Sequence, residues 1–246
     1  EKFANGHGVF TVVPEQDGIV RRVPTLFNYE DDLYTALSVE VMRVAFNRPT
    51  ILVTTNKAGI KDIRIASKRM FPPNGLILPT DRNGRVWPYF SKSDPAKYVS
   101  ARDVLNGTAN PDLIRGKLIM VGTSAAGLLD IRSTPIDPVI PGVEVHAQLV
   151  EAALHNEYLS RPNYFNAAEM FLIIVGGLLM VILVPWISAK WTMMLFFIVV
   201  GGSGATSWFL FAGLDFQPLP EILPAFSLKL EGGMLFDAVY AGTVIL

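Results

Sequence analysis

Residues 116–162 read GKLIMVGTSAAGLLDIRSTPIDPVIPGVEVHAQLVEAALHNEYLSRP. Inside this stretch, residues 118–121 form a short, continuous apolar run, which is typical of a strand buried on both faces of a parallel α/β sheet. Gly122 and Gly127 bracket small residues after that run, so the backbone there can turn sharply or approach a neighbouring segment closely. Residues 143–155 then repeat apolar side chains at helical spacing. The stretch predicts a buried strand, a glycine-rich turn, a polar loop and a helix.

Polar side chains crowd the predicted loop between this strand and this helix. They include Asp130, Arg132 and Thr134, and the loop ends at Pro141 and Gly142. Loops that follow buried strands are the usual binding position in α/β sheets. We therefore treat these three side chains as candidates for a small-ligand site or a signalling contact; the alternative is a purely structural polar loop.

His146, on the predicted helix, is the fourth candidate. With Glu144 and Asp130 it suggests a metal site, but residues two positions apart on a helix point in different directions, which is poor ligand geometry. A hydrogen-bonded structural histidine is the favoured interpretation. The sequence contains no cysteine, and we expect neither a metal nor a cofactor.

No group of residues argues for catalysis. Residues 122–127 have the outline of a phosphate loop but lack the following Lys and Ser/Thr. No Ser-His-Asp order or nucleophile elbow stands out. The sequence predicts no catalytic residue in this chain.

Before residue 165 the sequence predicts small strands, hairpins and short helices. Asp31 and Asp32 are expected to cap the first helix. Arg21 and Arg22 are interpreted as a solvated strand edge, with an anion or partner site as the alternative. The predicted elements are hairpins over residues 8–26 and 76–90, strands over residues 51–55 and 60–66, and helices over residues 34–46 and 100–105. Together they predict an α/β domain with a mixed sheet and helices.

Composition changes at about residue 165. The chain has 246 residues, of which 50% are hydrophobic and 17% are charged, and charges nearly vanish in the last third. We therefore expect one domain over residues 1–165 and a transmembrane region over residues 166–246. The net charge of −1 gives no reason to expect nucleic acid.

Two uncharged runs, residues 170–187 and 191–214, are long enough to span a bilayer. They predict transmembrane helices over about residues 167–187 and 191–213. Lys190 lies in the turn between them, which places this turn on the cytoplasmic side and residues 1–165 outside the cytoplasm. A third span over residues 218–246 is long enough but contains charged side chains such as Lys229 and Glu231, so two or three helices are expected.

Small residues recur on the second predicted membrane helix. Gly201 and Ala205 form a small-xxx-small pair, which lets helix backbones approach closely in lipid. They predict a helix-packing face, within the chain or in a homodimer. A generic run of small residues is the alternative.

Several motifs occur in an order that resembles a known family. They are EQDGIVRRVP, LILPTDRNGRVWPYF, YVSARDVLNG, GKLIMVG, LLDIRSTP and PGVEVHAQLVEAAL, and membrane helices follow them. The chain resembles the C-terminal half of the extracytoplasmic CHASE domain of the second type, found in bacterial membrane-bound cyclases and kinases. The resemblance implies that the first half of the sensor domain and an N-terminal membrane helix precede this sequence in a longer protein.

This resemblance implies a sensory and transmembrane module of a bacterial receptor. The module would lie in the inner membrane, with an unknown extracytoplasmic ligand and a cytoplasmic output domain outside this chain. A class III adenylate cyclase is the expected output, with a protein kinase or a cyclic-dinucleotide enzyme as the alternatives that the resemblance leaves open. The alternative is a non-catalytic integral subunit of a membrane complex. The expected partners are the lipid bilayer and either a second copy or another subunit.

Overall fold

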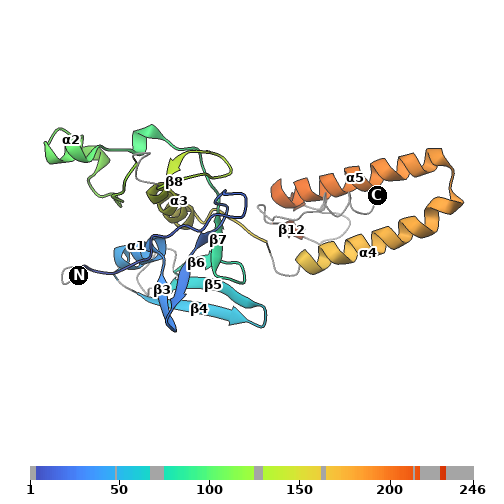
Figure 1. Cartoon of the computed structure of the whole chain (residues 1–246), viewed down its shortest axis with the longest axis horizontal. Coiled ribbons are helices and arrows are strands. Elements are labelled where there is room, and N and C mark those ends of the chain that lie inside the picture. Colours follow the sequence, from blue (N-terminus) through green and yellow to red (C-terminus); the bar gives the residue numbers. More distant parts are fainter. Residues whose placement is uncertain are drawn as a thin grey trace, which may run out of the picture. The chain divides into compact units, whose positions relative to one another are not determined.

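The computed structural model describes residues 4–47, 49–66, 75–124, 130–161, 165–212, 214–216 and 228–230 (Figure 1). The chain divides into two compact units, Glu1–Tyr158 and Leu159–Leu246. The first unit is a mixed α/β domain, and the second contains two long helices. The first unit contains strands β1 (Val23–Pro24), β2 (Leu26–Tyr29), β3 (Asp32–Thr35), β4 (Thr50–Asn56), β5 (Gly59–Ala66), β6 (Leu76–Pro79), β7 (Arg85–Pro88), β8 (Ile131–Arg132) and β9 (Ile140–Pro141), and helices α1 (Leu37–Ala45), α2 (Ala101–Leu105) and α3 (Gly142–His155), with 3-10 turns at Pro95–Lys97 and Pro111–Leu113.

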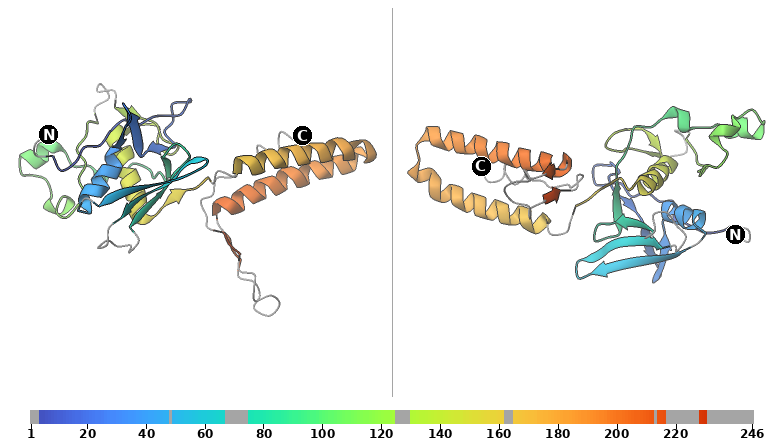
Figure 2. Two further views of the ribbon diagram at one scale, coloured as in Figure 1. Left: turned by 90° about the horizontal axis from the view of Figure 1, so that it is seen from below. Right: turned by 180° about the vertical axis from the view of Figure 1, so that it is seen from behind.

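Helix α3 lies at the centre of the first unit. It packs against α1 and against β1, β6, β7, β8 and β9, and Figure 2 shows α1 beside it. Val145, Leu149 and Ala153 recur at helical spacing and are buried in the core. The helix predicted from residue 143 to residue 155 is therefore confirmed, and its apolar stripe organises the domain.

The strands form several small sheets. The largest continuous one is the antiparallel sheet β4-β5-β6, whose inner face is formed by Ile63, Ile65 and Leu78. Strand β7 lies between β1 and β10 (Tyr158–Leu159), while β2–β3 and β8–β9 are separate two-stranded pairs. The mixed α/β class is confirmed, but the expected single sheet is replaced by these short pairings.

The predicted buried strand at residues 118–121 is not found. These residues have no regular secondary structure, and Leu118, Ile119 and Val121 are exposed, Val121 by 89%. Met120 alone among them packs against the core. The prediction failed because apolar composition indicates a strand that needs covering, whereas no described element of this chain covers it.

The first helix starts later than predicted. Residues 26–35 form the hairpin β2–β3, in which Glu30 and Asp31 both take positive φ at the turn. Asp32 is therefore a strand residue, and α1 starts at Leu37 without a side-chain cap. The capping role predicted for Asp31 and Asp32 was wrong, because the chain reverses where the helix was expected to begin.

Both predicted hairpin turns are present, but their strands pair elsewhere. Gly18 has positive φ, and its N–H donates to the Glu15 carbonyl oxygen across 2.9 Å. Beyond this turn, Val9 bridges Ala36 and Ile19 bridges Ser133. Strands β6 and β7 likewise join different sheets. The sequence therefore predicted the turns and not the partners of the strands that flank them.

The other short elements agree more closely with the sequence. Strands β4 and β5 match the predicted strands at residues 51–55 and 60–66 within a few residues. Helix α2 matches residues 100–105, although Ser100 makes no side-chain cap bond. No residue of α2 is buried.

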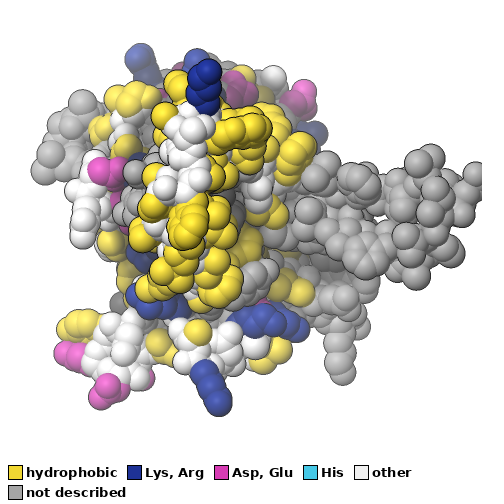
Figure 3. Space-filling model, turned by 90° about the vertical axis from the view of Figure 1, so that its right-hand side faces the viewer, with side chains coloured by type: hydrophobic (Ala, Val, Ile, Leu, Met, Phe, Trp, Pro, Cys, Tyr) yellow, Lys and Arg dark blue, Asp and Glu magenta, His cyan; other side chains and the backbone are white. Residues whose placement is uncertain are grey.

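The second unit contains two helices that are long and apolar enough to cross a membrane. They are α4 (Phe165–Leu183), which continues as a 3-10 turn to Trp186, and α5 (Ala189–Ala212). Most of their hydrophobic side chains are exposed, and hydrophobic side chains form the column nearest the viewer in Figure 3. Such a surface suits contact with lipid rather than with water.

Part of the third predicted span lies in a short strand pair. Residues 228–230 form strand β12, which pairs antiparallel with β11 (Leu214–Phe216). Residues 228–230 are therefore not helical, and the rest of the predicted span, residues 218–227 and 231–246, lies outside the described part, so a third span stays a prediction. A methyl group built on Gly201 meets nothing within 4 Å in the described structure. Packing of Gly201 and Ala205 against a second copy stays a prediction.

Candidate functional site

The hairpin β8–β9 places Asp130 at the start of α3. Ile131 pairs with Pro141, and the Gly142 N–H donates to the Asp130 carbonyl oxygen across 2.7 Å. A methyl group on Gly142 would overlap the Asp130 carboxylate, whose Cγ would lie 2.8 Å from the new carbon. A negative charge is favourable beside the first turn of a helix. Gly142 is therefore the residue that lets this carboxylate reach the helix.

Arg132 faces the same carboxylate. Its guanidinium lies 3.5 Å from Asp130 Oδ1, and the two side chains are 31% and 30% exposed. Solvent can therefore reach this ion pair, and its contribution to stability is small. The pair is the accessible edge of the candidate site.

Thr134 belongs to the loop itself. Its side chain is buried, and its hydroxyl donates to the Asp137 carbonyl oxygen and accepts from the Asp137 N–H, both across 3.0 Å. The preceding residue, Ser133, accepts a hydrogen bond from the Val20 N–H across 2.7 Å. Thr134 therefore shapes the loop, which is the structural alternative raised from the sequence, and a ligand contact by Thr134 stays a prediction.

His146 lies in the core of the first unit. The residue is 1% exposed, and its Nε2 lies 2.9 Å from the Phe10 carbonyl oxygen. A carbonyl oxygen only accepts, so Nε2 carries the proton and Nδ1 is the bare nitrogen of a neutral ring. Nδ1 is buried and has no hydrogen-bond partner among the described residues. Burial lowers the pKa of His146, and the Phe10 carbonyl and the Asp130 charge partly oppose that effect.

Three of the four predicted site residues thus gather at the N-terminal half of α3. Asp130 and Arg132 form the accessible part, His146 is buried and senses the Asp130 charge, and Thr134 is hydrogen-bonded within the loop. In the described ranges no three His, Asp or Glu side chains form a metal-binding group. The arrangement offers charge, a helix start and one buried proton acceptor, which suit binding or proton uptake.

A second polar cluster along α3 was missed from the sequence. Gln148 accepts from the Ser91 N–H across 3.2 Å and donates to the Ser91 carbonyl oxygen across 3.1 Å. Glu144 accepts hydrogen bonds from the Ser93 and Tyr98 hydroxyls. Burial and the hydrogen bond to Glu144 raise the pKa of Tyr98. The i, i+4 spacing of Glu144 and Gln148 was the available signal.

We expect Gln148→Ala to release residues 91–98 from α3, because both hydrogen bonds to the Ser91 backbone are lost. Ser91 itself is exposed, so water can replace part of what its backbone groups lose, and we expect a cost of about 1 kcal/mol. Hydrogen exchange of residues 91–98 should accelerate, while that of β4–β6 stays the same. Unchanged exchange at residues 91–98 would show that other contacts hold this segment against α3. Lys97→Ala, which removes an exposed ion pair with Glu151, is the matched control.

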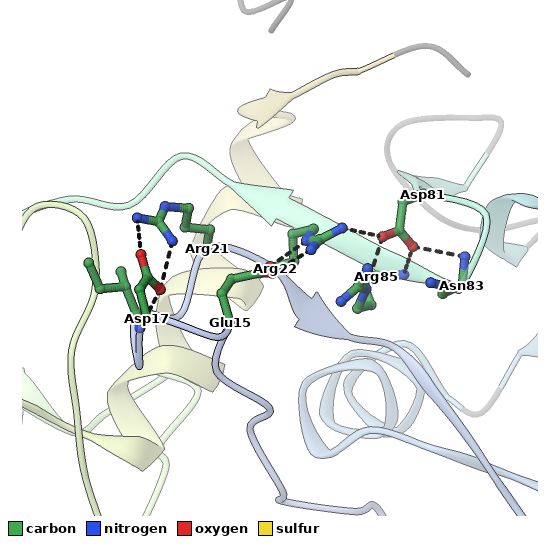
Figure 4. A network of polar contacts seen from close by, with 8 residues as sticks. Glu15, Asp17, Arg21, Arg22, Asp81, Asn83 and Arg85 are labelled. Atoms are coloured by element: carbon green, nitrogen blue, oxygen red, sulfur yellow. Dashed lines mark hydrogen bonds and ion pairs between the residues drawn. The ribbon is translucent and has the colours of Figure 1, made fainter. Parts of the chain in front are cut away.

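The two arginines of the first turn have separate partners (Figure 4). Arg21 pairs with Asp17 at the surface, as a solvated edge would. Arg22 is half-buried, bridges Glu15 and Asp81, and stacks over the Trp87 ring at 5.3 Å. Its hydrogen bonds hold the pKa of Glu15 below the usual value. The solvated interpretation was therefore wrong for Arg22, which ties two turns together.

The C-terminal end of α3 leads directly towards α4. Asn156 takes the left-handed conformation that ends α3, and the Glu157 N–H donates to the Ala152 carbonyl oxygen across 2.9 Å. Strand β10 follows and joins the sheet beside β7. Within the second unit, the Arg161 guanidinium donates to both carboxylate oxygens of Glu169, at 2.8 and 2.9 Å. Strand β10 thus follows the end of α3 in the sequence, and the Arg161–Glu169 ion pair lies at the start of α4.

Comparison with known proteins gives one family match. The family model of the CHASE2 domain matches residues 2–184, which include the whole candidate site and most of α4. The chain matches no curated protein and no solved structure.

Proposed function

Because the chain belongs to the CHASE2 domain family, a family of sensory domains, we propose that it is the sensory and transmembrane module of a signalling receptor. Residues 1–165 lie outside the cytoplasm and detect a signal. Helices α4 and α5 carry the resulting change across the membrane to a cytoplasmic output domain. The resemblance to receptors of this family makes an adenylate cyclase the proposed output and a bacterial inner membrane the proposed location.

One observation carries this proposal: the candidate site and the connection to the membrane helices lie at opposite ends of the same helix. Asp130 lies at the first turn of α3, and residues 156–164 connect its last turn to α4. Because α3 is packed in the core along its length, a displacement at its start is transmitted as a movement of the whole helix. Strand β10 and Arg161 then carry that movement to α4.

The topology can be tested with single cysteines, because the natural sequence has none. Asn106→Cys places a thiol on an exposed turn after α2, and Lys190→Cys places one in the first turn of α5, directly after the connection from α4. In intact spheroplasts a membrane-impermeant maleimide is expected to label Asn106→Cys and not Lys190→Cys. After the membrane is permeabilised, both should react.

The opposite labelling pattern would overturn the extracytoplasmic location. Equal labelling of both positions before permeabilisation would contradict a membrane-spanning hairpin. The expected labelling together with a tightly co-purifying, unrelated membrane protein and no signal-dependent change would favour the alternative, a non-catalytic subunit. The unmodified chain, which lacks cysteine, is the blank for both variants.

A further inference from the structure

His146 occupies a position that responds to protonation. Its Nε2–H is committed to the Phe10 carbonyl oxygen, so the next proton must enter at Nδ1. Nδ1 lies in the core without an acceptor among the described residues. A protonated ring therefore cannot keep its present position without an unsatisfied donor, which is costly in a low-dielectric interior.

One charged side chain acts directly on this ring. Asp130 attracts the protonated form of His146, and the same carboxylate is packed against Gly142 at the start of α3. Of the other charged groups on the elements that pack against α3, Glu40 pairs with Arg43 and Arg85 pairs with Asp81, whereas Arg132 pairs with Asp130 itself. Protonation thus sets the imidazolium in competition with Arg132 and the start of α3 for one carboxylate.

The Phe10 hydrogen bond links this competition to a second segment. Val9, next to Phe10, donates its N–H to the Thr35 carbonyl oxygen and accepts from the Leu37 N–H, at 2.9 and 2.8 Å. His146 therefore connects α3 to the strand segment that holds the start of α1. A ring that turns towards Asp130 releases this connection.

We propose that His146 and Asp130 form a proton-responsive switch: proton uptake at Nδ1 draws the Asp130 carboxylate from the start of α3 and frees the segment at Phe10. The signal is then extracytoplasmic acidity, and the proton comes from the solvent. The role in sensing rests on the proposed function. Proton uptake by His146 and the opening that it causes do not depend on that function.

The direction of the effect follows from the lowered pKa of His146. The unfolded chain binds the proton at the ordinary pKa of about 6.5. The stabilisation is complete above that pH and is lost as pH falls through the lower pKa of the folded state, because the open or unfolded form then holds more protons. One proton changes the opening equilibrium constant by at most about tenfold per pH unit.

The test uses the full chain in lipid nanodiscs between pH 7.5 and 5. Hydrogen exchange around Phe10 and the start of α3, corrected for the intrinsic pH dependence of exchange, reports the opening. His146→Gln keeps an N–H donor for Phe10 but does not titrate in this range. His155→Gln is the matched control, because His155 is exposed on the same helix.

We expect opening to increase towards low pH in the wild type and in His155→Gln, and to be flat in His146→Gln. Asp130→Asn should move the response to lower pH, since it removes the charge that favours protonation. Wild-type pH dependence in His146→Gln would overturn the switch. If that variant does not fold, the imidazole nitrogen NMR signals of the wild type decide the question.

With only three histidines in the chain, the signals of the buried ring can be assigned by exclusion. We expect the Nε2–H tautomer and a pKa of His146 below the ordinary histidine value of about 6.5. A pKa of His146 at or above that value would overturn the switch. A normal titration that leaves α4 unchanged would contradict the relay of the proposed function and leave the switch intact.

Discussion

Replacing Gly142 with alanine is expected to lower the free energy of unfolding by about 2 kcal/mol, within the usual cost of overpacking a filled site. The new methyl group would overlap the Asp130 carboxylate, whose Cγ would be 2.8 Å away. Asp130 cannot move off freely, because its carbonyl oxygen accepts from the Gly142 N–H across 2.7 Å. The carboxylate must therefore rotate away from the helix start. Denaturant unfolding of the chain in detergent would measure the loss.

The double variant Asp130→Ala, Gly142→Ala separates this overlap from other effects. Truncating Asp130 removes the atoms that clash, so the double variant should be more stable than Gly142→Ala alone. Gly177→Ala is the matched control, because a methyl group on that helical glycine meets nothing within 4 Å among the described residues. It should be neutral or slightly stabilising, since alanine favours helices. A Gly142→Ala protein as stable as the wild type would show that Asp130 is not seated on the helix.

The sequence predicted α3 because the signal for an amphipathic helix is local. Val145, Leu149 and Ala153 lie at helical spacing, and the same spacing places them on one buried face. The position of Asp130 next to Gly142 was not predicted, because the sequence indicated only a polar loop where the hairpin β8–β9 brings them together. The helix could be predicted because its signal lies in residues less than fifteen positions apart.

The remaining features depend on contacts between distant segments. The partner of His146 is Phe10, 136 positions away, and no local pattern indicates it. The turn at Glu30 and Asp31 was missed because hairpin turns with positive φ at both positions usually contain Asn or Gly. The apolar run at residues 118–121 predicted burial, but composition does not specify which element would provide the cover.

At Gly122 the neighbouring sequence predicted one structural feature correctly and another one wrongly. The sequence indicated a close backbone approach at this glycine, and a methyl group there would lie 2.5 Å from Cβ of Val143. The approach is made to α3 itself, so the exposed segment 116–124 passes the same helix end as Asp130 does. The close approach at Gly122 was therefore predicted correctly, whereas the strand predicted for residues 118–121 of the same segment was wrong.

The connection to α4 allows the second large prediction. Arg161→Ala is expected to loosen the first turns of α4, because it removes the cation that binds both oxygens of Glu169 and also contacts Asn166. The Glu169 side chain is only 15% exposed, so water does not readily replace the lost bonds. Loss of charge-assisted hydrogen bonds of this kind costs about 2 kcal/mol, or roughly a 30-fold increase in local opening. Hydrogen exchange of residues 165–172 in nanodiscs would measure it.

The same variant tests whether movement of α3 reaches the membrane. With Arg161 present, acidification that opens the start of α3 should also change hydrogen exchange in α4. In Arg161→Ala the response at α3 should persist and the response in α4 should disappear.

Arg161→Ala combined with Glu169→Gln removes both charges and should restore part of the stability of α4. Lys97→Ala, which breaks an exposed ion pair on α3, is the control and should leave α4 unaffected. An α4 response that survives in Arg161→Ala would contradict a role of the Arg161–Glu169 ion pair in carrying the signal to α4.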